Sequence, residues 1–300
     1  EGDWGLTLRP ELLDRAARHF RTVRLPVRWS NHASADAQAR IDEAFARRVD
    51  AAVDRLLAAG AWVILDLHHY MQLAGGGPLH PHEFSVDESV LEDRLVNLWR
   101  QVAARYHNRS PRLLFELLNE PPGGDGPGLG GERGNRLAAR ALAAVRESNP
   151  TGVVLVGPDD WNHPRGLARL QLPRDPNLIV SIHSYDPFDF THQGVPWRQP
   201  PLPRGVGCCD DAQRRQVREA LDTATAWSRA QGVPLHLGEF GAYREAPMPA
   251  RAAYARLVRE EAEARGIGWA WWEFASDFSP VWDSAKGRWV EPIRRALGVK

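Results

Sequence analysis

Two glutamates follow apolar runs that lie far apart in the sequence. Glu120 comes after the run LLFELL at 113–118 and directly after Asn119, and Glu239 comes after LHLG at 235–238. A short apolar run bounded by turn residues predicts a buried strand, so each carboxyl group is expected where a strand ends. Cleavage of a glycosidic bond needs two such groups. One is protonated and assists the leaving oxygen, and the other is ionised and attacks or activates water.

Polar and aromatic residues at the ends of other predicted strands could assign these two roles. Neighbouring charges, burial and hydrogen bonds decide which acid keeps its proton. Arg24, His68 and His183 could hold one acid ionised, and apolar surroundings together with the nearby second acid would raise the pKa of Glu120. Tyr185 could hydrogen-bond a carboxylate at the adjacent strand end. The residues expected to support the two acids are Arg24, His68, Asn119, His183, Tyr185 and Trp272.

Several of these residues have plainer explanations. Glu116 and Arg24 could form an ion pair inside a barrel. Four histidines could instead be metal ligands of a barrel hydrolase, but their spacing lacks a compact ligand motif and the carboxylates already supply a complete mechanism, so we expect no metal and no cofactor. These histidines are His68, His69, His183 and His192. Four acids are interpreted as loop or capping residues, namely Asp159, Asp160, Asp277 and Asp283.

The composition excludes some classes of partner. Lys+Arg 38 balance Asp+Glu 38 and no charged run is present, which argues against nucleic acid, anionic membranes and polyanionic substrates. No stretch approaches the roughly 18 to 20 uninterrupted apolar residues of a membrane helix. The sequence holds Trp 12, and indole faces suit the apolar faces of sugars. We nevertheless expect most of them in the core, including Trp62, Trp99, Trp227 and Trp269.

The only cysteines are Cys208 and Cys209, which are adjacent in a loop rich in proline and glycine. Because they are neighbours, they cannot bridge distant parts of the fold. We expect free thiols, with a vicinal disulfide as the alternative. The loop they belong to, 188–210, is too long for a mere connector, and loops of that length usually cover a site.

Predicted strands and helices alternate along the whole chain. The expected strands are 22–27, 62–67, 113–118, 151–156, 178–182, 233–238 and 267–272. The expected helices are 11–20, 42–59, one opened by a capping box at 85–88, 135–147, 212–230, 249–265 and 292–297. This alternation predicts a parallel sheet covered by helices. Candidate residues follow nearly every strand, which favours a closed barrel over an open sheet, and we expect one domain over 1–300.

Seven motifs together resemble glycoside hydrolase family 5, and within it the bacterial cellulase branch, some members of which also cut mannan. They are VRLPVRW at 23–29, DLHHY at 66–70, FELLNEP at 115–121, HSY at 183–185, FTHQG at 190–194, GEFG at 238–241 and WWEF at 271–274. The resemblance implies a (β/α)8 barrel, a retaining double displacement and no metal. It implies Glu120 as the acid/base and Glu239 as the nucleophile. The residues it suggests for glycan binding are Trp29, His69, Trp161, His192 and Trp197.

Two departures from the branch stand out. Its members begin with a strand of the Gly-(Val/Ile)-Asn-Leu-Gly kind ahead of a segment like residues 2–5, and the given sequence starts inside that segment. We therefore expect the first barrel strand to be absent from the given chain. The segment 277–280 also differs from the glycine-rich version usual in the branch.

We interpret the chain as a retaining endo-β-1,4-glucanase that acts on cellulose or related β-glucans. A β-mannanase or a dual glucanase/mannanase is the alternative within the class, because no motif fixes how the 2-hydroxyl is recognised. A glycan-binding protein without activity would be expected to lack one of the acids, and both are present. We expect a polysaccharide as the substrate, a monomer, and no binding to nucleic acid or membrane. The resemblance favours a secreted protein, although the given sequence begins without a signal peptide.

Overall fold

The computed structural model describes residues 6–74, 84–123 and 128–300. These residues form two compact units. The first, here the β1–β5 unit, comprises the described part of 21–181. The second, here the β6–β7 unit, comprises residues 6–20 and 182–300.

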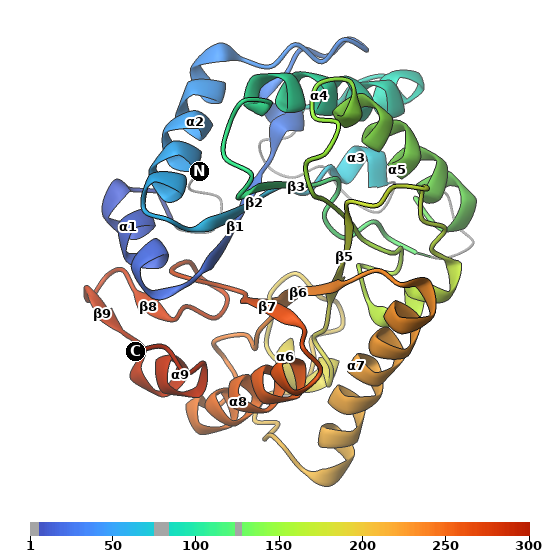
Figure 1. Ribbon diagram of the computed structural model, residues 1–300. Coiled ribbons are helices and arrows are strands. Elements are labelled where there is room, and N and C mark those ends of the chain that lie inside the picture. The colour runs from blue at the N-terminus through green and yellow to red at the C-terminus, as the bar shows by residue number, and fades with distance from the viewer. Residues whose placement is uncertain (1–5, 75–83, 124–127) are drawn as a thin grey trace. The chain divides into compact units, whose positions relative to one another are not determined.

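Parallel strands in chain order build the β1–β5 unit (Figure 1). They are β1 Thr22–Val27, β2 Trp62–Leu67, β3 Leu113–Glu116, β4 Val154–Val156 and the first residues of β5 Leu178–His183. Buried apolar side chains lie on both faces, and Ile64, Leu114 and Leu155 form a cluster on one of them. In the register of the sheet, Asp66 on β2 lies opposite Glu116 on β3. Two acids therefore stand side by side on neighbouring strands.

The longer helices of this unit each bury one apolar face. They are α2 Glu43–Ala58, α3 Met71–Ala74, α4 Leu91–Tyr106 and α5 Gly131–Arg146, with short 3-10 turns at Trp29–His32, Glu88–Val90 and Pro164–Arg169. Asp42 caps α2 by accepting a hydrogen bond from the Phe45 N–H at 2.7 Å. The helices α4 and α5 lie side by side (Figure 1). The predicted capping box at 85–88 is wrong, because Asp87 is the capping residue and accepts from the Ser89 N–H.

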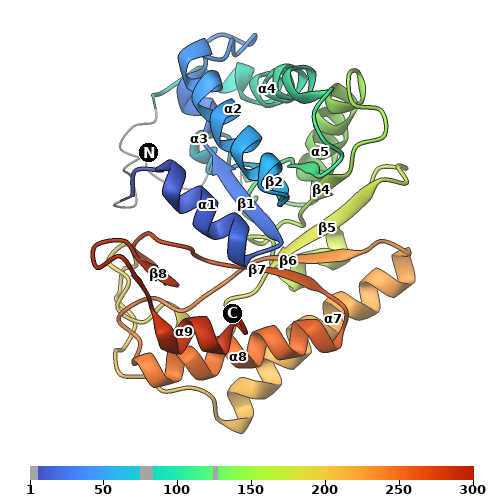
Figure 2. The same cartoon turned by 60° about the vertical axis from the view of Figure 1, so that its left-hand side comes forward.

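The β6–β7 unit contains β6 Leu235–Phe240 and β7 Gly268–Trp271, which are parallel. Its helices are α1 Pro10–His19, α6 Phe188–Thr191, α7 Asp211–Gln231, α8 Met248–Ala264 and α9 Glu291–Ala296. A full capping box of Asp210 and Gln213 opens α7. The helices α8 and α9 lie side by side (Figure 2).

A small hairpin holds α1 in place within the β6–β7 unit. Its strands are β8 Trp282–Asp283 and β9 Arg288–Trp289. Leu12 of α1 packs with Ala275 and Trp282 in one apolar cluster. The Arg15 guanidinium carbon lies 3.8 Å from the centroid of the Trp282 ring, a cation–π contact. The sequence pattern did not predict this hairpin, since two-residue strands carry no period.

Most predicted elements are present with shifted bounds. All seven predicted strands occur, and β1 is the first strand among the described residues. Trp99 is buried as predicted, but Trp62 is 46% exposed at the start of β2, so its prediction as a core residue is wrong. Trp227 and Trp269 are half-buried. The expectation of one domain over 1–300 stays a prediction.

The prediction of free thiols is also wrong. Cys208 and Cys209 are joined in a vicinal disulfide, because the adjacent side chains turn toward each other just before α7. Among the described residues, no helix combines the length and the apolar content that crossing a lipid bilayer requires.

Candidate functional site

Glu120 lies just beyond β3 and is held by backbone contacts on both sides. The Asn119 N–H donates to the Leu67 carbonyl at the end of β2, at 2.9 Å, and the Pro121 carbonyl accepts from the Trp161 N–H at 3.1 Å. Glu120 itself has a φ of 48°, in the left-handed region that side chains rarely adopt. Such strain persists only where the surroundings enforce it, and it is common at functional sites.

A buried network of polar side chains lies beside Glu120. Arg24 donates through Nε to Glu116 Oε2 at 2.6 Å and through Nη2 to Asn119 Oδ1 at 2.8 Å. Its Nη2 also lies 3.1 Å from Asp66 Oδ2, and His68 Nδ1 lies 2.6 Å from the same oxygen. The ion pair that is the plainer explanation for Arg24 and Glu116 is therefore present. The network fixes the Asn119 amide with its carbonyl on Arg24, and among the described residues its buried Nδ2 meets no acceptor.

The environment of Glu120 favours its protonated form. Burial raises the pKa of the Glu120 carboxyl to about 7, the Glu116 charge adds to this effect, and Arg24 opposes it. A carboxylic acid with a pKa near 7 keeps its proton at mildly acidic pH and can donate it to a leaving oxygen. The predicted rise in pKa is thus present, and its largest cause is the desolvation expected from the sequence.

Glu239 lies in the β6–β7 unit, near the end of β6, and is only 4% exposed. Tyr185 Oη donates a hydrogen bond to Glu239 Oε2 at 2.8 Å, and His183 Nδ1 lies 3.8 Å from the same oxygen. The Ser184 N–H donates to the Glu239 carbonyl at 3.1 Å, which fixes the strand end beside β5. A hydrogen bond from a phenol stabilises a carboxylate, as predicted for Tyr185. These contacts fix the position of the Glu239 carboxyl group near the end of β6.

The strand ends of β6 and β7 approach each other closely. The Trp272 N–H donates to the Phe240 carbonyl at 2.9 Å. A Cβ on Gly241 would lie 2.3 Å from the Trp272 carbonyl oxygen, so only glycine fits there. This contact explains the glycine that ends the GEFG motif and places Trp272 at the edge of the Glu239 strand.

Glu273 is a structural residue that the sequence analysis did not single out. Its carboxyl group accepts hydrogen bonds from the N–H groups of Ser276, Phe278 and Ser279. Burial raises its pKa, although these hydrogen bonds oppose the rise. The buried Arg251 donates to the Ser279 hydroxyl at 3.1 Å and adds a nearby positive charge. Glu273 therefore shapes the loop that carries Phe278.

Six ring side chains form what we call the aromatic cluster, which extends outward from Tyr185. His192 lies edge-on to Tyr185, with ring centroids 5.0 Å apart, and stacks on Phe188 at 4.1 Å. Phe278 also contacts Tyr185, at 5.9 Å. Trp197 is 64% exposed, so its ring offers an open face at the outer end, whereas the Phe188 ring lies between His192 and Arg198. The cluster consists of Tyr185, Phe188, His192, Trp197, Tyr243 and Phe278.

The other residues expected to bind glycan have different surroundings. Trp29 is fully buried and packs edge-on against Phe45 with ring centroids 5.6 Å apart, so it is a core residue and the prediction that it binds glycan is wrong. His69 has a φ of 47° and lies edge-on to His68 at 4.1 Å. Trp161 is 49% exposed, in a run of left-handed residues that presents its indole outward.

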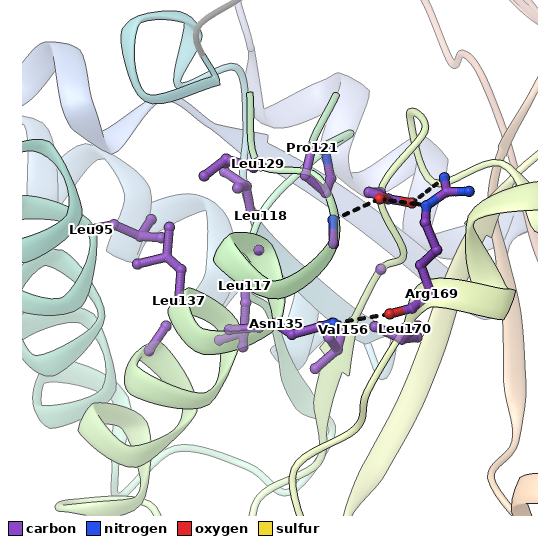
Figure 3. Close-up of a pocket in the computed structure, with 16 residues that line it drawn as sticks. Leu95, Leu117, Leu118, Pro121, Leu129, Asn135, Leu137, Val156, Arg169 and Leu170 are labelled. Carbon is purple, nitrogen blue, oxygen red and sulfur yellow. Dashed lines mark hydrogen bonds and ion pairs between the residues drawn. The ribbon is translucent and has the colours of Figure 1, made fainter. Parts of the chain in front are cut away.

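A small cavity lies behind the Glu120 loop within the β1–β5 unit (Figure 3). It is lined by Leu117, Pro121 and neighbouring apolar residues, and its volume is about 40 Å³, which has room for a few water molecules but not for a sugar. At its edge, Asp159 accepts from the Gly131 N–H at 2.9 Å and pairs with Arg169 at 2.6 Å. The interpretation of Asp159 as a loop or capping residue is confirmed, since it lies in a turn and accepts from the first N–H of α5.

The model for the cellulase family, glycosyl hydrolase family 5, matches residues 11–277. The chain belongs to this family. Endoglucanase H of Acetivibrio thermocellus is 31% identical over 280 residues, which are 91% of this chain and 28% of that protein. Endoglucanase A of Clostridium longisporum is 27% identical over 85% of this chain and 48% of its own length. The family 5 chain thus spans less than half of either relative.

Solved structures give the same family. One, described as an endoglucanase, has 35% identity and a TM-score of 0.90, covering 99% of this chain and 92% of its own. Cel5A of Thermotoga maritima, solved in complex with mannotriose, has 33% identity and a TM-score of 0.89 over 99% and 92% of the two chains. The predicted (β/α)8 fold class is confirmed by these neighbours. The described residues of this family 5 chain supply seven strands of this fold, β1 to β7.

Proposed function

We propose that this chain is a retaining endo-β-1,4-glucanase that hydrolyses internal bonds of cellulose or related β-glucans. The observation that carries the proposal is the family match over 11–277, because that range contains both acids and the motifs around them. Two relatives that align with 91% and 85% of this chain are named endoglucanases. The different surroundings of the two carboxyl groups support a division of roles between them.

In the first step, Glu239 attacks the anomeric carbon while Glu120 donates its proton to the leaving oxygen. The raised pKa of Glu120 suits the donor, and the hydrogen bond from Tyr185 suits the nucleophile. In the second step, the ionised Glu120 takes a proton from water while the water oxygen attacks the anomeric carbon, which breaks the bond between the sugar and Glu239 and restores both groups.

The supporting residues act on the same two steps. The Asn119 amide, oriented by Arg24, donates from Nδ2 to a sugar hydroxyl. His68 and His183 orient the two acids, and Trp272 lies under the sugar at the cleavage point. His69, Trp161, His192 and Trp197 bind the chain at sites farther along. The exposed indoles of Trp161 and Trp197 suit stacking on sugar rings.

Mannan is a second candidate substrate. Thermotoga maritima Cel5A, a neighbour of similar identity, was solved with cellobiose and with mannotriose. Both sugars form flat β-1,4 chains, so one aromatic surface can accept either. If the chain also cleaves mannan, it is a dual glucanase/mannanase.

Product analysis tests the function. The chain is incubated with hydroxyethylcellulose, glucomannan and galactomannan, and new reducing ends and viscosity are measured together. An endo-acting enzyme lowers viscosity before many reducing ends appear. Early NMR spectra of products from cellopentaose should show the β-anomer. Release of the α-anomer refutes retention, an absence of products from all three polymers refutes the function, and activity that depends on added metal favours the metal alternative.

A further inference from the structure

Arg198 lies at the outer side of the aromatic cluster, in the segment between α6 and α7. Its guanidinium carbon is 5.3 Å from the centroid of the Phe188 ring. Phe188 stacks on His192 with an angle of 15° between the planes, and His192 contacts Tyr185. A series of ring contacts thus leads from the hydrogen-bond partner of Glu239 to an exposed cation.

The charge of Arg198 is not neutralised by this protein. Among the described residues, no carboxylate oxygen lies within 4.0 Å of its side-chain nitrogens. The two other arginines near the cluster do have such partners. Arg204 lies 3.8 Å from Glu245, and Arg244 lies 2.9 Å from Asp277. Arg198 therefore differs from its neighbours in presenting an unneutralised fork of N–H donors to the solvent.

His192 adds no second positive charge at this edge. Burial together with the Arg198 charge lowers the pKa of His192 to about 3, so the imidazole is neutral at ordinary pH. The cation that faces the Phe188 ring is therefore Arg198.

We propose that Arg198, held over the Phe188 ring, and the exposed ring of Trp197 form an accessory subsite for a β-glucan that carries carboxylate groups on its backbone. Ring faces accept the apolar side of a sugar, and a guanidinium binds a carboxylate through two parallel N–H donors. This inference rests on the proposed function and names a substrate class for it. The balanced overall charge disfavours dense polyanions, but a single arginine suits a chain with sparse acidic groups.

Two soluble polymers of matched length test the subsite, because carboxymethylcellulose is anionic and hydroxyethylcellulose is neutral. The readout is the ratio of kcat/KM on the anionic polymer to kcat/KM on the neutral one. Arg198→Gln should lower this ratio about one and a half to fivefold, the range expected for one exposed ion pair. Arg198→Lys should retain part of it, since the charge stays but the fork is lost. The wild-type ratio should also fall as salt is added.

Arg204→Gln is the matched control, because it removes an arginine from the same loop that already has a carboxylate partner. Its ratio should stay at the wild-type value. An unchanged ratio in Arg198→Gln, or an equal fall in Arg204→Gln, overturns the subsite.

A binding measurement separates this inference from the proposed function. Retardation of each variant in native gels that contain either polymer needs no catalysis, and mobility in gels without polymer corrects for the altered charge. If the wild type cleaves neither polymer, the proposed function fails, but selective loss of retardation by Arg198→Gln in the anionic gel still supports the subsite. Equal retardation of Arg198→Gln and wild type in that gel refutes it.

Discussion

The proton on Glu120 should set the alkaline limit of activity. The pKa of its carboxyl group is raised from 4.5 to about 7. At 1.36 kcal/mol per pKa unit, this places the ionised form about 3.4 kcal/mol higher than it would be in water. Bond cleavage needs the protonated form, so kcat/KM on an unactivated oligosaccharide should fall as pH rises through about 7.

Glu116→Gln tests the electrostatic cause of this limit. The substitution removes a negative charge that raises the pKa of Glu120 and leaves Arg24 with one fewer acid partner. Both changes favour ionised Glu120, so the alkaline limit should move to lower pH. The assay is a pH profile of kcat/KM on cellopentaose. Glu147→Gln is the matched control, because it removes an exposed carboxylate paired with Arg100 in the same unit.

A substrate with a good leaving group provides the second control. A dinitrophenyl cellobioside needs no proton for departure, so its glycosylation step should lose the alkaline limit near pH 7. The reasoning fails if Glu116→Gln folds, as judged by circular dichroism, and its limit stays in place or moves to higher pH. It also fails if the activated substrate shows the same limit as cellopentaose.

Other predictions concern the two acids and the rings beside them. Glu120→Gln and Glu239→Gln should each lower kcat by several orders of magnitude. If either variant keeps a tenth of wild-type activity, the substituted glutamate is not essential to the mechanism. At pH 8, Glu120→Gln should also unfold at a higher temperature than wild type, because folding keeps Glu120 protonated and its contribution to stability is lost as pH rises from 4.5 through 7. Tyr185→Phe should lower kcat about 10- to 150-fold, the range for a lost hydrogen bond to a charged group, whereas an unchanged kcat would remove it from the mechanism. Trp272→Ala should mainly lower kcat, whereas Trp197→Ala should mainly raise KM for long oligomers. Equal effects of the two substitutions on KM would contradict these separate roles.

The strands and part of the site could be predicted because they depend on local pattern. Apolar runs of four to six residues gave all seven strands, since a sheet covered on both faces needs nearly continuous apolar sequence. The ion pair of Arg24 with Glu116 is one of the interpretations that charges within such runs allow, because a buried charge requires a partner. The hydrogen bond from Tyr185 to Glu239 followed from their positions at strand ends.

The rest depends on contacts that no local pattern encodes. Phe188 begins α6, and Tyr243 and Phe278 come from two separate loops, so the contacts that gather them in one cluster arise only from the fold. The predictions for Trp29 and Trp62 are both wrong, because the sequence around a tryptophan at the end of a strand does not show whether the ring faces the core or the solvent. The role of Glu273 is similarly hidden, since its partners are backbone N–H groups rather than side chains.

The proposed assignment of acid and nucleophile rests on two local environments rather than on one pairwise distance. Glu120 has lost solvation and has a like charge nearby, and its left-handed backbone keeps it there against the intrinsic preference of the chain. Glu239 receives a phenolic hydrogen bond, and Gly241 lets its strand approach Trp272 closely. Exchanging the two environments would exchange the roles, because the side chains are chemically identical. The division of roles between the two acids therefore follows from their neighbours. Substituting these neighbours should shift the pH dependence of activity without removing the reacting groups.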